Sequence, residues 1–186
     1  MAPSGRVHDR AILDALEAIG PMPFEGEVWR IARKGRDPLR GSGAHGRWSP
    51  GGEFEVLYTS VARDGALAEI GFRLSLEPVW PSRLEHEIHE IAARSPRTLH
   101  IADLAGLAHL GIETARYESF DYQATQSIAA AAHFLEFDGL KVPSARAPCS
   151  NVVFFTDRVA DEHGLSLRRS EAVDWDAWRS TRRPSR

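Results

Sequence analysis

Basic side chains gather in a short, glycine-rich stretch of the chain. Five arginines and one lysine lie between positions 30 and 47, where Asp37 is the only acidic residue. Six glycines between positions 35 and 52 disfavour a helix, so we expect loops and short strands there. Guanidinium groups on such a backbone suit a polyphosphate, because they can bind its oxygens with paired hydrogen bonds.

A carboxylate follows this stretch on a segment with helical periodicity. In the expected helix 61–72, Ala62, Ala66 and Ile70 mark the buried stripe, and Glu69 borders it. A carboxylate on a rigid helix can stabilise positive charge that develops during a reaction. The arginines and Glu69 together predict a site for a nucleotide whose sugar carbon becomes cationic. From the sequence alone, an ordinary glutamate at the solvent boundary of the helix remains the alternative.

Several short motifs follow one another in order over roughly residues 24–160. They are Trp29-Arg30, Gly46-Arg47-Trp48, Leu57-Tyr58-Thr59-Ser60, Glu69, Asp121-Tyr122 with Gln126, Asp138-Gly139 and Val142-Pro143-Ser144-Ala145-Arg146. This ordered series resembles the RES domain family, which is named after an arginine, a glutamate and a serine. The chain departs from the family pattern at Trp29, where tyrosine is usual, and at His45-Gly46, where two glycines are usual.

The resemblance implies a fold and a role for each matched residue. The fold would be a single α+β domain, an ADP-ribosyltransferase-like split β-sandwich with surrounding helices and a cleft for NAD⁺. Arg30 and Arg47 would bind the pyrophosphate of this substrate. Tyr58 would stack on the nicotinamide ring, and Ser144 would hold its amide or the adjacent ribose. Glu69 would stabilise the oxocarbenium ion at C1′ and hold the ribose 2′-hydroxyl. No metal would take part.

Each of these residues also has a simpler interpretation. Arg30 is compatible with a surface arginine stacked on an aromatic neighbour, and Arg47 with a charge on a solvated loop. Tyr58 is compatible with a tyrosine of the core, and Ser144 with a serine of an ordinary turn. The order of the motifs along the chain is what favours a shared site.

The resemblance also implies a biological activity, because RES-family proteins are toxins of type II toxin–antitoxin pairs. We expect cleavage of the nicotinamide–ribose bond of NAD⁺ and transfer of ADP-ribose to a protein, with ribose-phosphate pyrophosphokinase as one candidate acceptor. The flanks 1–23 and 171–186 would help to dock that protein. The alternative is an NAD⁺ hydrolase or phosphorylase that depletes the cell of NAD⁺. An Xre-like antitoxin would be the partner and would block the cleft.

A non-enzymatic RNA-binding module is the alternative from another class. The net charge of −3 and the absence of a recognisable nucleic-acid motif from the sequence argue against it. The single cysteine, Cys149, excludes an internal disulfide and suits a reducing cytoplasm. The first ten residues lack the apolar stretch of a signal peptide, and the longest apolar runs are too short to span a membrane. We therefore expect a cytoplasmic protein without membrane or direct nucleic-acid contact.

The 186 residues, 42% of them apolar, are enough to bury the core of one domain. We expect a helical extension at 1–23, a catalytic domain at 24–170 and a C-terminal helix with a basic tail at 171–186. The sequence pattern predicts helices at 9–19, 61–72, 83–93, 123–136 and 174–183, and strands at 27–32, 54–59, 98–102, 140–143, 152–156 and 165–170, the last at a sheet edge. These elements do not alternate as βαβ units, which indicates an α+β fold.

Two further groups of side chains allow either a functional or a purely structural interpretation. His86 and His89 lie three positions apart on the expected helix 83–93, and this spacing can share a metal. Because no further ligand motif accompanies them, we interpret them as part of a solvated helix face. The basic tail could contact RNA or an acidic partner, although ragged basic termini usually only aid solubility. Its arginines are Arg179, Arg182, Arg183 and Arg186.

Overall fold

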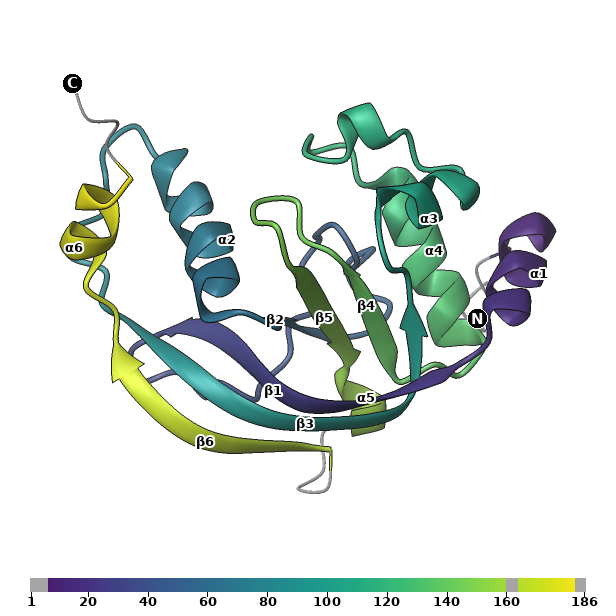
Figure 1. The fold of residues 1–186 in the computed structure, drawn as a ribbon, viewed down its shortest axis with the longest axis horizontal. Helices are drawn as coiled ribbons and strands as arrows, with labels where there is room; N and C mark the ends of the chain where they lie inside the picture. Colours follow the sequence, from purple (N-terminus) through teal and green to yellow (C-terminus); the bar gives the residue numbers. More distant parts are fainter. Residues whose placement is uncertain (1–6, 160–163, 183–186) are drawn as a thin grey trace.

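Long, curved strands form the floor of the molecule in the view of Figure 1, and most helices stand above them. The computed structural model describes residues 7–159 and 164–182. Its helices are α1 (Arg10–Ile19), α2 (Arg63–Ser75), α3 (Leu104–His109), α4 (Gln123–Phe134), α5 (Thr156–Val159) and α6 (Trp175–Ser180), with a 3₁₀ turn η1 (Thr114–Arg116). Its strands are β1 (Met22–Arg33), β2 (Val56–Ser60), β3 (His86–His100), β4 (Gly139–Pro143), β5 (Ser150–Phe155) and β6 (Leu165–Ala172). The predicted α+β class and single domain are confirmed.

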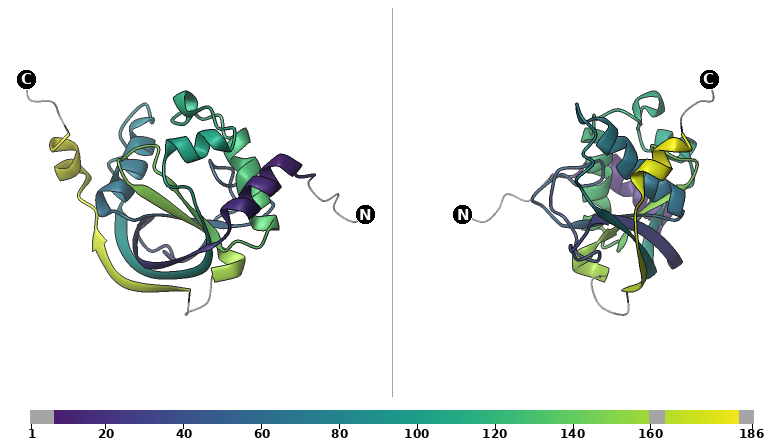
Figure 2. Two further views of the ribbon diagram at one scale, coloured as in Figure 1. Left: turned by 45° about the vertical axis from the view of Figure 1, so that its right-hand side comes forward. Right: turned by 90° about the vertical axis from the view of Figure 1, so that its left-hand side faces the viewer.

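Hydrogen bonding joins these strands into one mixed sheet. The order runs β1, β2, β5, β4 and β3, and β3 then pairs with β1, so five strands close into a ring. The left view of Figure 2 shows this ring between the helices. The long β1–β3 ladder is the reason that the strands form one sheet and not the two sheets of the expected split β-sandwich. The β6 strand pairs with β3 outside the ring and is an edge strand, as predicted.

The segment 83–93 differs most from its prediction. It is not a helix, because His86 begins the strand β3, which also contains most of the short strand predicted at 98–102. The β1 strand pairs along one edge of β3 and the β6 strand along the other. This pairing joins segments that are far apart in the sequence, so local periodicity does not reveal it.

The same difference corrects our interpretation of the two histidines. His86 and His89 are only 7% and 2% exposed, so they do not lie on a solvated helix face. His86 accepts a hydrogen bond at Nδ1 from Trp175 Nε1 at 3.1 Å, and His89 Nδ1 lies 2.8 Å from Ser170 Oγ. Both histidines therefore belong to the packing of β3 against its neighbours.

The other predicted helices and strands are confirmed with shifted ends. None of the helices in the described part of the chain is long and apolar enough to cross a membrane. Two arginines of the predicted basic tail, Arg183 and Arg186, lie outside the described residues, as do residues 1–6 of the predicted extension.

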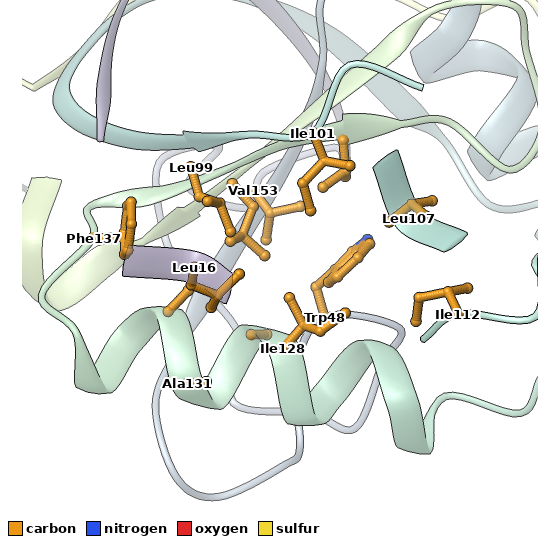
Figure 3. Close-up of a cluster of buried hydrophobic side chains, with 14 of the residues drawn as sticks. Leu16, Trp48, Leu99, Ile101, Leu107, Ile112, Ile128, Ala131, Phe137 and Val153 are labelled. Carbon is orange, nitrogen blue, oxygen red and sulfur yellow. The ribbon is translucent and has the colours of Figure 1, made fainter. Parts of the chain in front are cut away.

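The largest buried cluster packs helices α1 and α4 on the sheet (Figure 3). Leu16 of α1 and Ile128 of α4 are fully buried in it. The buried face of α4 is otherwise mainly alanine, so the helix backbone can approach the strands closely. Trp48 is 2% exposed in the same cluster and fixes the end of the glycine-rich loop in the core. Burial of a large aromatic ring contributes on the order of 2–3 kcal/mol.

Two buried histidines and one half-buried histidine predict a pH-dependent stability. Burial lowers the pKa of His86, His89 and His100 below the ordinary value of 6.5. As the pH falls through 6.5, the unfolded chain binds protons before the folded protein does, so the free energy of unfolding should decrease. Each histidine can contribute at most about 1.4 kcal/mol per pH unit. We expect denaturant unfolding to give a lower stability at about pH 5.5 than at about pH 7.5.

A substitution that removes one titrating group provides the control for this measurement. His86→Phe should lower stability at both pH values, because Trp175 Nε1 loses its acceptor. It should also reduce the difference between the two pH values. Equal stability of the unsubstituted protein at both pH values would contradict the assignment of neutral, buried histidines.

Candidate functional site

A cavity of about 350 Å³ lies between α2 and the glycine-rich loop of residues 41–52. Four of the five predicted site residues line it, one each from β1, the loop, β2 and α2: Arg30, Arg47, Tyr58 and Glu69. The fifth, Ser144, contacts Glu69 directly. Small-molecule sites commonly have volumes of about 300–1,000 Å³. The structure therefore brings the predicted residues together around one cavity of suitable size.

The carboxylate of Glu69 is held through one of its two oxygens. Ser144 Oγ donates a hydrogen bond to Glu69 Oε1 at 2.6 Å, and Asn151 Nδ2 donates to the same oxygen at 2.8 Å. Glu69 Oε2 accepts no hydrogen bond from the residues that the structure describes. One oxygen thus fixes the orientation of the carboxylate, and the other is available to a ligand.

Local structure explains how these three side chains meet. Glu69 lies on α2 at the boundary predicted from Ala66 and Ile70, and it is half-buried. Ser144 follows β4 in a tight turn, where its hydroxyl accepts hydrogen bonds from the backbone amides of the next residues. Asn151 lies on β5 opposite Ser60 of β2. Asn151 was not predicted from the sequence, where its only signal is a polar residue just before a buried apolar strand.

Arg30 is a largely buried cation on β1. Its guanidinium donates to the carbonyl oxygens of Tyr58 at 3.1 Å and Arg40 at 3.4 Å. Burial lowers the pKa of Arg30 to about 10, and the charge of Asp37 opposes this shift. Its Nε is buried and has no hydrogen-bond partner among the described residues. A buried, charged guanidinium with an unused donor suits an anionic ligand.

Arg47 belongs to an ordered wall of the cavity and is not a mobile loop charge. Its guanidinium lies 4.8 Å from the ring centroid of Tyr117 and 4.9 Å from that of Tyr122. It donates to the carbonyl oxygen of Tyr117 and, at 3.2 Å, to that of Ser119. Arg47 therefore connects the glycine-rich loop with residues 117–122, which form the opposite rim.

Gln126 of α4 fixes the conformation of the glycine-rich loop. Its Nε2 donates to the carbonyl oxygens of Gly46 at 2.7 Å and Ser49 at 3.1 Å, and it lies 2.9 Å from His45 Nε2. His45, which departs from the usual family pattern, is thus part of this network. The motif residue Gln126 acts on the cavity through the loop, because it does not line the cavity itself.

Tyr58 connects the loop with the sheet. Its hydroxyl oxygen accepts a hydrogen bond from the backbone amide of Trp48 at 2.9 Å. Burial raises the pKa of Tyr58 to about 12, so the phenol is neutral near pH 7. Burial also raises the pKa of Tyr117, whose hydroxyl donates to the carbonyl oxygen of Pro143 at 2.7 Å. Both rings line the cavity, and both hydroxyls are used within the protein.

Two further arginines, Arg73 and Arg146, line the cavity and were given no role by the sequence analysis. Arg73 lies four residues after Glu69 on the same helix. Side chains at this spacing lie on the same helix face, so the sequence predicts that the two are neighbours. Within residues 7–159 and 164–182, no three His, Cys, Asp or Glu side chains form a group that could hold a metal ion.

The cavity is lined by arginines, tyrosines and an oriented carboxylate, and its volume suits a small ligand. These features define a candidate nucleotide-binding site. The chain belongs to the RES domain family, whose family model matches residues 27–176. The probable NAD(+) phosphorylase Rv3189 of Mycobacterium tuberculosis is 32% identical over 120 residues, which cover 64% of this chain and 56% of that protein. The NAD(+) phosphorylase MbcT of Mycobacterium bovis is 23% identical over 168 residues, which cover 87% of this chain and 90% of that protein.

The fold is also similar to a solved structure. A chain of the M. tuberculosis MbcT–MbcA toxin–antitoxin complex superposes with a TM-score of 0.82 over 94% of this chain and 98% of that chain, at 21% sequence identity. At this level of identity, the similarity establishes the fold. The ring of strands and the helices around it therefore form a known fold.

The close contact between the loop and Tyr58 predicts the effect of a single methyl group. A Cβ at Gly46 would lie 2.8 Å from the Tyr58 hydroxyl oxygen, which would have to move and would lose its hydrogen bond to Trp48. Overpacking of this kind costs roughly 1–3 kcal/mol. We expect Gly46→Ala to lower the free energy of unfolding by that amount in denaturant titrations.

The same loop offers a matched control. A Cβ at Gly43 would lie 3.8 Å from Glu55 Cγ, which is an ordinary contact. Gly43→Ala should therefore change stability by no more than about 0.5 kcal/mol. If both alanine variants had the same stability, Tyr58 and Gly46 would not be packed as described.

Proposed function

We propose that this protein is an NAD⁺ phosphorylase that acts as the toxin of a toxin–antitoxin pair. The observation that carries the proposal is the carboxylate of Glu69, which two donors hold by one oxygen in a cavity lined by arginines. Relatives named NAD(+) phosphorylases support phosphate as the acceptor. They favour the depletion of NAD⁺ over transfer to a protein, which was the first choice of the sequence analysis.

The bond between nicotinamide and ribose requires little help from an acid. The nicotinamide ring is cationic in NAD⁺, so it leaves as a neutral molecule with the electron pair of the C1′–N bond. The energetic difficulty is the positive charge that develops on C1′ and the ring oxygen. The free oxygen of Glu69 would stabilise this charge and accept a hydrogen bond from the ribose 2′-hydroxyl.

The arginines and tyrosines of the cavity would position the rest of the substrate. Arg30 and Arg47 would bind the pyrophosphate, because both are ordered cations at the cavity and Arg30 has an unused donor. The ring of Tyr58, which lines the cavity, would stack on nicotinamide. Ser144 would act through Glu69, since its hydroxyl hydrogen is already donated to that carboxylate.

An oxygen of inorganic phosphate would complete the reaction. As the C1′–N bond breaks, an unprotonated oxygen of hydrogenphosphate forms the C1′–O bond, and the products are nicotinamide and ADP-ribose 1″-phosphate. No base is needed, because the attacking oxygen carries no proton. Transfer of ADP-ribose to a protein such as ribose-phosphate pyrophosphokinase remains the alternative, and the experiment below distinguishes the two acceptors.

An antitoxin protein would control this activity. The similar fold in the MbcT–MbcA complex comes from a toxin–antitoxin pair, which supports a partner of that kind. The antitoxin, which we expect to be Xre-like, would have to close or fill the cavity of about 350 Å³ to stop the reaction. We propose a cytoplasmic site of action, where NAD⁺ is available.

Incubation of the pure protein with NAD⁺ labelled in the adenylate group tests the proposal. We expect release of nicotinamide that requires phosphate, formation of labelled ADP-ribose 1″-phosphate and no labelled protein in a cell extract. Labelled protein with slow turnover of NAD⁺ would favour protein ADP-ribosylation. Salt-dependent RNA binding with NAD⁺ left intact would favour the non-enzymatic alternative.

Two substitutions on α2 connect this activity with the site. Glu69→Gln keeps the shape of the side chain and removes its charge, so turnover should fall by roughly 10²–10³ while the fold is retained. Asp64→Asn removes a charge from the exposed first turn of the same helix and should leave turnover unchanged. Normal release of nicotinamide by a folded Glu69→Gln variant would exclude Glu69 from the reaction.

A further inference from the structure

Arg146 is a nearly buried cation with few partners. Its side chain is 11% exposed, and its guanidinium lies 3.6 Å from the ring centroid of Phe72. Nη2 donates to the carbonyl oxygen of Glu118 at 2.7 Å. Nη1 lies 3.9 Å from the carboxylate of Glu118, whose side chain is 79% exposed, so this ion pair is weak. The guanidinium is therefore held in place while much of its capacity to bind an anion is unused.

Arg146 also lies in the wall between two hollows. It lines the cavity that contains Glu69, and it lines a second hollow of about 570 Å³ between α2 and α6. Arg179 and Arg182 line this second hollow, where they lie 4.5 Å from the ring centroids of Trp80 and Trp178. Among the described residues, Glu77 is the one acidic residue of its lining. The second hollow is thus positively charged, and Arg146 lines both it and the cavity.

A short chain of hydrogen bonds ties the backbone of Arg146 to the carboxylate. The amide of Arg146 donates to Ser144 Oγ at 3.1 Å, and Ser144 Oγ donates to Glu69 Oε1 at 2.6 Å. An anionic acceptor that approaches C1′ must come close to the negative charge of Glu69, which repels it. A cation near the carboxylate is needed to offset this repulsion. Arg30 and Arg47 already have two carbonyl partners each and lie where the pyrophosphate is proposed to bind. Arg73 also lines the cavity, but it is exposed, so solvent screens its charge more than that of Arg146.

We propose that Arg146 binds the acceptor, inorganic phosphate, and that the hollow between α2 and α6 is its entrance. This inference rests on the proposed function. Paired donors of the guanidinium bind two oxygens of hydrogenphosphate, and a third, unprotonated oxygen forms the bond to C1′. The C1′–N bond breaks in the same reaction, and nicotinamide leaves with its electron pair. Arg146 thus determines that phosphate, and not water, receives the ADP-ribose.

Separate kinetic constants for the two substrates test the role of Arg146. Arg146→Gln should raise the KM for phosphate at least tenfold, with a much smaller change in the KM for NAD⁺. It should also raise the share of ADP-ribose, the product of water attack, relative to ADP-ribose 1″-phosphate. Arg146→Lys should be intermediate, because it keeps the charge but loses the paired donors. Arg168→Gln, on the exposed part of β6, should match the unsubstituted protein in both constants.

A binding measurement without NAD⁺ separates this inference from the proposed function. Inorganic phosphate should raise the melting temperature of the unsubstituted protein and of Arg168→Gln, but not that of Arg146→Gln. Sulfate, a tetrahedral dianion, should have the same effect and should inhibit the reaction in competition with phosphate. If the protein cleaved no NAD⁺, the proposed function would fail, and loss of phosphate protection in Arg146→Gln would still support the anion site. Equal protection of both variants, no protection of the unsubstituted protein, or an unchanged KM for phosphate would overturn the inference.

Discussion

The contact of two donors with a single oxygen of Glu69 is the interaction on which the candidate site depends. It joins three elements: the helix α2, the turn after β4 and the strand β5. The turn after β4 and the strand β5 both lie far from α2 in the sequence. The contact therefore forms only when the sheet is complete. Ser144 and Asn151 leave the second carboxylate oxygen without a protein partner among the described residues. The fold therefore orients the carboxylate before any substrate binds, which is the form of preorganisation that electrostatic catalysis requires.

The opposite wall of the cavity is ordered by a second set of contacts. Gln126 binds the carbonyl oxygens of the glycine-rich loop, and Tyr58 binds the amide of Trp48. Arg47 connects the loop with the rim at residues 117–122 through its contacts with Ser119 and Tyr122. The loop needs glycine where space is short, as at Gly46, and where the backbone is left-handed, as at Gly52 with φ +73°. The burial of Trp48 in the core anchors the loop. A loop ordered in this way can present Arg47 at a defined position to a pyrophosphate.

Much of the site was predictable from the sequence, because the order of motifs selected residues that the fold brings together. Glu69 borders the buried face of α2, as its spacing from Ala66 and Ile70 indicated. The strand β3 was not predictable from local periodicity, because its pairing with β1 and β6 is a tertiary property. Asn151 was missed for a similar reason, and Arg146, although it belongs to a quoted motif, was given no role. Their importance arises from contacts with Glu69 and with a second hollow, and neither contact leaves a periodic signal in the sequence.

A crystal structure of the protein with a non-cleavable analogue of NAD⁺ tests the central claim most directly. The account predicts that the free oxygen of Glu69 lies within hydrogen-bonding distance of the ribose 2′-hydroxyl, while Ser144 and Asn151 still bind the other oxygen. It also predicts that Arg30 and Arg47 contact the pyrophosphate. An analogue bound with its ribose away from Glu69, or a Glu69 that turns from Ser144 and Asn151 to bind it, would contradict the account.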